Sequence, residues 1–181
     1  MYLGDIYWLA QKGPISKLHF DLEIPQANTV DRIANIIVEI ASGITSKDGL
    51  QCLEGISERQ KGYYLDAANY LGFIRASGEN LKPTKVARLF GDSSETKRVE
   101  ILMRQMFGMY SLRQAFLELI ELGITPNTKS VKEDQMTRLE QLIRTESLFG
   151  SDRTEYSEVT IERRAESAHS WLKWIFSQVT K

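Results

Sequence analysis

The sequence predicts a mainly α protein of tandem winged helix-turn-helix domains, with a small β-hairpin wing and an N-terminal extended arm. Two observations lead to this fold class. Residues 57–72 carry the start, the apolar stripe and the stop of a helix, and a hairpin pattern follows at 73–83. A second helix of similar design begins at Ser157. We therefore divide the chain into an arm at 1–27, a winged helix-turn-helix domain at 28–92 and a second helical, winged-helix-like domain at 93–181.

Length and composition fit a soluble protein with an ordinary surface. The chain has 181 residues, of which 42% are hydrophobic and 26% charged, and this suits one large domain or two small ones. A run of about 18 apolar residues and a secretory signal peptide are both missing, so we expect a cytoplasmic protein without membrane contact. The single cysteine, Cys52, excludes an internal disulfide and a cysteine-based zinc site.

The first 27 residues form the arm. Residues 5–10 are compatible with a short helix or a strand, and Gly13 and Pro14 end that segment. Residues 18–24 alternate apolar and polar side chains, which is typical of a strand. We expect an extended segment that packs on the first domain.

Residues 28–54 supply the two helices that come before a recognition helix. Asn28 or Thr29 can cap the first, whose apolar residues recur with helical spacing until Gly43. Residues 46–53 predict a short second helix, which Gly55 ends.

Residues 57–71 predict the recognition helix itself. Ser57 caps it, and Gln60 three residues later completes a capping box. The apolar side chains of the following turns form one stripe, and Gly72 stands where a glycine ends a helix.

The hairpin and the helices after it complete the order. Residues 73–83 predict the wing, and Pro83 suits the first turn of a short helix that reaches Gly91. Ser111 can cap a helix in the second domain. There we expect helices at 96–107, 111–122, 131–149 and 157–175.

The sequence shows no catalytic, metal-binding or cofactor site. A Gly-rich phosphate loop, a nucleophile elbow and zinc-ligand spacing are all missing, and the two histidines accompany no nucleophile pattern. We therefore expect no enzyme activity and no cofactor in this chain. The candidate acidic clusters fall on the solvated faces of predicted helices: Glu118, Glu121, Glu133 and Asp134.

The candidate functional residues are polar side chains of the two capped helices and the hairpin. Such side chains reach phosphates and base edges of duplex DNA. The alternatives are a solvated face with a half-buried tyrosine on the first helix, and ion pairs with Glu162 or Glu166 on the last. The net charge of −1 argues against strong non-specific DNA binding but permits a local basic face. The candidates are Ser57, Arg59, Gln60, Lys61, Tyr63, Arg75, Lys82, Lys85, Thr160, Arg163 and Arg164.

The same segments resemble a known family. Residues 56–74, ISERQKGYYLDAANYLGFI, look like the winged-helix segment beside the nuclease domains of type II restriction endonuclease-like proteins. Those proteins have a similar S/T-E-R-Q-x-x-Y-Y-x-x-A-x-x-L-G-L stretch and a wing that ends in a Leu-Thr-Pro-like step, where this chain has Lys82 in place of Thr. The segments VTIERRA at 159–165 and WLKWI at 171–175 are similar to the family's second helical segment. The resemblance covers residues 28–180.

The resemblance implies a target-recognition module for double-stranded DNA in a restriction or defence system. It carries DNA contact over to the candidates on the helices at 57–71 and 157–175. In that family a nuclease domain would follow the tail, so cleavage is not expected from this chain. Trp171 and Trp174 are expected in the core or against a nuclease domain or a second copy. The alternative function is a winged-helix module for protein–protein interaction or transcription regulation, which the near-neutral charge favours.

Overall fold

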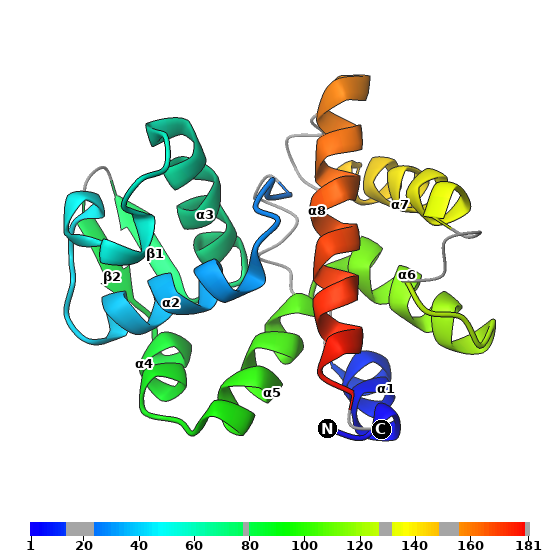
Figure 1. Cartoon of the computed structure of the whole chain (residues 1–181), viewed down its shortest axis with the longest axis horizontal. Coiled ribbons are helices and arrows are strands. Elements are labelled where there is room, and N and C mark those ends of the chain that lie inside the picture. The colour runs from blue at the N-terminus through cyan, green and yellow to red at the C-terminus, as the bar shows by residue number, and fades with distance from the viewer. Residues whose placement is uncertain (14–23, 78–79, 127–131, 149–155, 180–181) are drawn as a thin grey trace.

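The computed structural model describes residues 1–13, 24–77, 80–126, 132–148 and 156–179. Most of these residues form helices, and one small sheet lies among them (Figure 1). The expected mainly α class with a two-stranded antiparallel sheet is confirmed. One group comprises α2 (Val30–Ala41), α3 (Glu58–Tyr70), β1 (Ile74–Ser77), β2 (Asn80–Pro83) and α4 (Lys85–Gly91). The other comprises α1 (Leu3–Lys12), α6 (Tyr110–Glu121), α7 (Lys132–Ser147) and α8 (Glu158–Ser177), and α5 (Glu95–Met106) lies between the groups.

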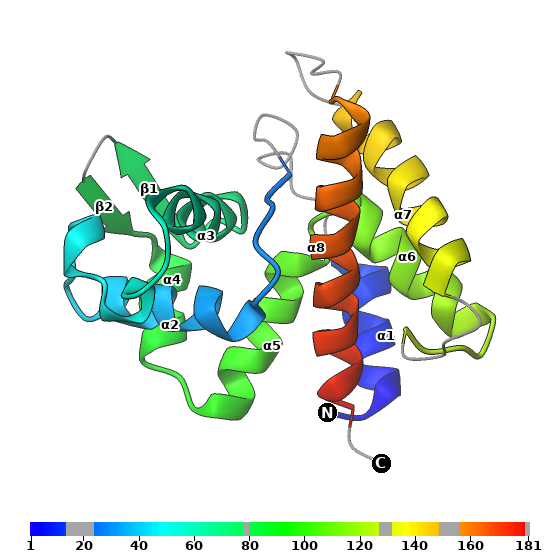
Figure 2. The ribbon, with the colours of Figure 1, turned by 45° about the horizontal axis from the view of Figure 1, so that its top comes forward.

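Helix α8 forms the side of the second group that faces the first group in both views (Figures 1 and 2). It packs on α6 and α7 and also meets the start of α2. The indole Nε1 of Trp171 donates to the carbonyl oxygen of Ala27 at 2.7 Å, and that of Trp174 donates to Asp31 Oδ1 at 3.0 Å. The buried apolar residues form one continuous cluster through both groups. The division of the chain at residues 92 and 93 stays a prediction.

Of the two alternatives for residues 5–10, the helix is confirmed: residues 3–12 form α1, so this part of the expected arm is helical and not extended. Ile6, Leu9 and Ala10 make a helical stripe, and all three are buried where α1 packs on α5 and α6. The guanidinium of Arg113 donates to the carbonyl oxygens of Gln11 and Gly13, both at 2.7 Å, and so caps the end of the helix. The strand expected at 18–24 lies outside the described residues except for Ile24, which is buried and belongs to no strand.

The single short helix predicted at 46–53 is replaced by two 3₁₀ turns, η2 (Lys47–Gly49) and η3 (Gln51–Leu53). Between them Leu50 takes an extended conformation, with φ −82° and ψ 104°, and its side chain is buried. The extended backbone of Leu50 interrupts the helical residues, so two single 3₁₀ turns form in place of one α-helix.

The hairpin forms as predicted, with Ile74 paired to Pro83 and Ser77 paired to Asn80. The predicted place of Pro83 in the next helix is wrong, because Pro83 is the last residue of β2. Helix α4 is capped instead by Thr84, whose Oγ1 accepts from the amide of Ala87 at 3.3 Å. At the other end of the recognition segment, Gly72 has φ +75° and ends α3 as expected.

A buried carboxylate joins three helices. Glu146 of α7 is 3% exposed and accepts hydrogen bonds from the backbone amides of Tyr110 at 3.0 Å and Ser111 at 2.9 Å. It also accepts from the hydroxyl of Tyr70, at the end of α3, at 3.1 Å. The predicted cap of α6 by Ser111 is therefore wrong: Ser111 lies in the first turn, and a carboxylate 35 residues away satisfies the amides of the helix start.

Glu146→Gln tests this carboxylate through the pH dependence of stability. Burial raises the pKa of Glu146 above its ordinary value of 4.5, although the hydrogen bonds from Ser111, Tyr110 and Tyr70 oppose the shift. For a raised pKa, the group's contribution to stability is complete below about pH 4.5 and is lost as pH rises through the folded pKa. We expect the unfolding free energy of the native protein, relative to Glu146→Gln, to fall as pH rises from about 4.5 to neutrality.

Urea unfolding at several pH values measures this difference. The exposed carboxylate of Glu133, on the same helix, provides the control: Glu133→Gln should track the native protein at every pH. If the unfolding free energy of the native protein rises with pH relative to that of Glu146→Gln, the role of burial is contradicted.

Candidate nucleic-acid interface

Two of the predicted site residues build the start of α3. Ser57 Oγ accepts from the backbone N–H of Gln60 at 3.3 Å, and the side-chain Oε1 of Gln60 accepts from the backbone N–H of Ser57 at 3.3 Å. The capping box expected from the sequence is therefore present. These bonds use the oxygen of the Gln60 amide and do not use its N–H groups, which remain on an exposed side chain.

Arg59 and Tyr63 lie together one helical turn apart. Arg59 Nε donates to the hydroxyl of Tyr63 at 2.5 Å, and its guanidinium carbon lies 5.5 Å from the ring centroid. This contact holds the guanidinium along the ring. The predicted contacts Arg59 and Tyr63 thus form one unit, with cationic and aromatic groups side by side on the exposed surface of α3.

Lys61 takes part in a local charge cluster. Its Nζ lies 2.7 Å from Glu58, which also pairs with Lys47 at 2.6 Å. Hydrogen bonds from Lys47 and Lys61 lower the pKa of Glu58 to about 2, so this carboxylate stays charged at neutral pH. The charge of Lys61 is therefore partly neutralised before any ligand arrives.

The hairpin places two cations opposite each other. Arg75 on β1 is the direct cross-strand partner of Lys82 on β2, and both side chains are exposed. No ion pair joins either of them to an acid among the described residues, and the same holds for exposed Lys85 at the start of α4. Like charges directly opposite destabilise a strand pair, so this arrangement favours an anion between them.

The adjacent arginines of α8 lie in different surroundings. Arg163 is exposed, and in the described part of the chain it forms no ion pair with Glu162 or Glu166. Arg164 is 3% exposed, and its guanidinium carbon lies 4.0 Å from the ring centroid of Tyr156. The structure thus places Arg164 inside the protein, as a poor candidate for an outer DNA contact.

The third α8 candidate lies at the helix start. The hydroxyl of Thr160 is 2.9 Å from that of Ser157, which caps α8. Thr160 therefore takes part in the helix start, in the same way as Gln60 does on α3.

A cleft of about 470 Å³ separates the start of α3 from α8. It brings together five of the predicted residues, namely Ser57, Arg59, Gln60 and Tyr63 of α3 with Arg163 of α8. A smaller hollow of about 250 Å³ shares Tyr63 and Gln26 with the cleft and is lined by Arg164, Asp66 and Asn69 among others. The hairpin candidates, Lys61 and Thr160 do not line either space.

Sequence reasoning missed the second wall of this cleft. Gln26 and Asn28 come from the irregular segment before α2, and Glu166 and Ser167 come from α8. No periodicity marks residues 24–28, so no sequence pattern would have identified them. Their signal is spatial: the segment before α2 runs between α3 and α8 (Figure 2).

Nucleophilic or metal chemistry finds little support here. Burial and the neighbouring carboxylate of Glu39 raise the pKa of Cys52 to about 12, so its thiol is protonated at neutral pH. Within the described ranges no three His, Cys, Asp or Glu side chains gather as metal ligands. In the same residues no helix has the length and apolar character needed to cross a membrane.

The two tryptophans expected in the core or at an interface both contact other residues of the chain. Trp171 is 1% exposed and lies in the core, so it offers no surface to a nuclease domain or a second copy. Trp174 is half-buried and bonded to Asp31.

Residues 32–180 match the model of a protein family described as "Domain of unknown function (DUF7226)". The match covers most of the chain, including α3, the hairpin and α8, and the chain belongs to this family. No curated protein and no solved structure matches the sequence.

Alanine substitutions of the two adjacent arginines should separate structure from surface. Arg164→Ala removes a buried guanidinium that stacks on Tyr156, and we expect a loss of about 2–4 kcal/mol in unfolding free energy. Arg163→Ala removes an exposed charge and should change stability by less than about 0.5 kcal/mol. Urea unfolding measures both, and equal losses in the two variants would refute the assignment of different surroundings.

Proposed function

Starting from this family membership, we propose that the chain is a sequence-specific module for double-stranded DNA, in which residues 28–92 act as a winged helix-turn-helix domain. The observation that carries the proposal is the hairpin register, which sets Arg75 directly opposite Lys82 without an acid to pair them among the described residues. Two exposed cations held in this way fit the phosphates of a nucleic-acid backbone.

The order of elements supports the winged-helix part of the proposal. After α2, Ser46 forms an isolated antiparallel bridge with Asn80, and the amide of Leu81 donates to the carbonyl oxygen of Thr45 at 2.8 Å. The short segment 44–46 therefore lies beside β2 in the position of a third strand. Two 3₁₀ turns stand where the second helix of such a domain would lie, and α3 and the hairpin follow. This order resembles the helix, strand, helix, helix and wing of such domains.

In the proposed mode, α3 reads the major groove. Arg59 and the amide N–H groups of Gln60 lie on the first turn, and arginine and glutamine are common partners of guanine and adenine edges. The pairing of Arg59 with Tyr63 restricts its rotamers before binding, which lowers the entropy lost on contact. Arg75, Lys82 and Lys85 hold phosphates, and Arg163 approaches the DNA from α8 across the cleft.

Residues 93–181 act in this proposal as a second, winged-helix-like domain that positions α8. The resemblance to restriction endonuclease-like proteins supports a recognition role in a cytoplasmic restriction or defence system, with cleavage by another domain or protein. Ser57 and Thr160 contribute mainly by capping their helices, and Arg164 contributes by holding Tyr156.

Acidic groups around α3 favour one alternative, a winged-helix module that binds proteins or regulates transcription. Asp66 and Glu166 belong to the walls of the two connected spaces beside α3, and the net charge of the chain is −1. Carboxylates there repel phosphates and suit a basic partner segment. Binding to randomised duplexes at several salt concentrations separates the functions: salt-dependent binding with enriched sequences supports DNA, and no binding at low salt refutes it.

The double variant Arg75→Ala/Lys82→Ala tests the phosphate contacts. We expect weaker binding to all duplex sequences alike and a decrease of about 2 in the slope of log K against log salt, at about 0.9 per phosphate contact. Lys97→Ala/Arg104→Ala is the matched control, because it removes the same charge from exposed residues of α5 that pair with Glu100. If both double variants weaken binding equally, the hairpin residues contribute only through the net charge of the protein, and the proposed phosphate contacts are refuted.

Arg59→Ala tests base readout. We expect the preference at one base pair to relax by about 1–3 kcal/mol, while affinity for unrelated duplexes changes little. Tyr63→Phe keeps the ring but removes the hydroxyl that accepts from Arg59, so it should give a smaller relaxation at the same position. Selection of bound sequences from a random duplex library measures both, and an unchanged preference in Arg59→Ala would rule out this residue as a reader.

A further inference from the structure

A third space lies away from the DNA-facing cleft, where α6, α7 and α8 meet. It has a volume of about 180 Å³. We propose that it binds a compact, uncharged, apolar molecule that carries one hydroxyl or carbonyl oxygen, with Gln135 as the polar contact. This proposal does not depend on the proposed DNA binding.

The walls explain the apolar part of the ligand. Most of the lining side chains are aliphatic and come from three helices and the turn after α6: Ala115, Leu119, Leu122, Ile124, Leu139 and Leu172. The space is open on one side, where Leu122 is 71% exposed. Its volume suits a ring of six atoms with a small substituent, since an enclosed aliphatic cavity of about 150 Å³ in another protein takes up benzene. Filling it would restore dispersion contacts that the wall atoms lack.

Gln135 explains the oxygen. This side chain is 8% exposed and lines the space. Its Oε1 lies 3.2 Å from Nε2 of buried His169, whereas its Nε2 has no hydrogen-bond partner among the residues that the structure describes. An unsatisfied buried donor destabilises the protein, and a ligand oxygen would satisfy it. A hydroxyl serves with either orientation of the amide, because it both donates and accepts.

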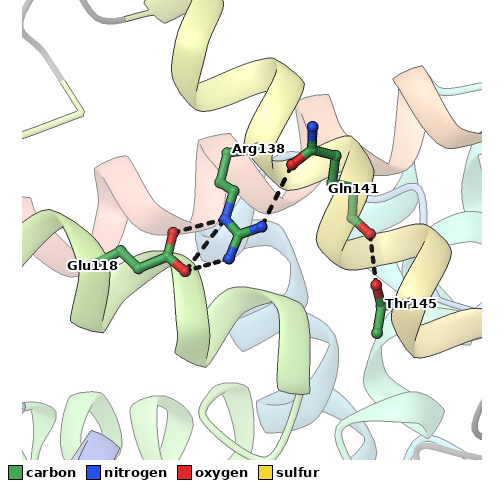
Figure 3. Close-up of polar contacts among 4 residues, drawn as sticks. All are labelled: Glu118, Arg138, Gln141 and Thr145. Carbon is green, nitrogen blue, oxygen red and sulfur yellow. Dashed lines mark hydrogen bonds and ion pairs between the residues drawn. The ribbon is translucent and has the colours of Figure 1, made fainter.

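The rim explains why the ligand is uncharged. The guanidinium of Arg138 on α7 spans to Glu118 on α6, with Nη2 to Oε1 at 2.6 Å and Nε to Oε2 at 2.9 Å (Figure 3). These two bonds occupy Nε and Nη2 of the guanidinium, and its Nη1 donates a further bond to Gln141 Oε1 at 3.4 Å. Arg138 and Glu118 both line the space and neutralise each other, so the remaining charge of the lining is that of Asp134, which repels a ligand carboxylate. A cation would lose hydration against the aliphatic walls.

Phenol and toluene are the probes, because they differ by a hydroxyl in place of a methyl group. Methyl NMR titration of the full chain should show saturable shifts at Leu139 and Leu172 but not at Leu89, which is exposed on α4. We expect a phenol Kd of about 1 mM, a scale set by its few atoms, and toluene binding at least about fivefold weaker.

Two variants test the site. Ala115→Met fills the space, so binding of both probes should disappear. Gln135→Met removes the amide but keeps the length of the side chain, so phenol should lose its advantage over toluene. Gln51→Met, the same substitution at an exposed residue of η3 outside the space, is the control and should leave both affinities unchanged.

The remaining outcomes overturn the proposal. Absence of phenol shifts, equal binding of phenol and toluene by the native chain, or binding that survives Ala115→Met each refutes this ligand class. Self-association that Ala115→Met abolishes, without phenol binding, would assign the space to an apolar side chain of a second copy. Thermal unfolding of each variant identifies any that fails to fold, and the Gln135→Met comparison then still decides.

Discussion

The carboxylate of Glu146 leaves α7 and meets, inside the protein, the first amides of α6 and the hydroxyl of Tyr70 on α3. A carboxyl group in such a place is tolerated only when several donors surround it, so the three helices must keep their mutual positions. Tyr70 ends the same helix that Ser57 begins, and α8 packs on α7. The spacing of the α3–α8 cleft therefore depends on this buried group, although Glu146 does not line it.

Local patterns predicted the elements whose partners lie nearby in the chain. The capping box at Ser57 and Gln60, the glycine stop at Gly72 and the hairpin all use contacts within a few residues, and all formed as expected. Two other elements depend on distant groups: Arg113 caps α1, and Glu146 caps α6. No window of sequence contains both members of such a pair, so these two caps were out of reach, although the sequence already allowed a helix at residues 5–10.

The candidate site divides in the same way. Arg75 and Lys82 become cross-strand partners once the hairpin is known, so their juxtaposition follows from the sequence pattern. Arg163 and Arg164 are identical side chains at neighbouring positions, and only the packing of α8 against Tyr156 separates the exposed one from the buried one. The opposing wall at residues 24–28 has no periodic signal because irregular backbone is placed by its tertiary contacts.

The two tryptophans of α8 make the intrinsic fluorescence of the protein sensitive to the packing of α8 against the α2 region. Trp171 and Trp174 reach across to Ala27 and Asp31 at the beginning of α2, so their emission depends on the separation of the two helices. The third tryptophan of the chain, Trp8 on α1, is 55% exposed and contributes a water-like background that a quencher can remove. Any occupant that moves α3 and α2 relative to α8 should therefore alter the fluorescence of the native chain without an attached dye.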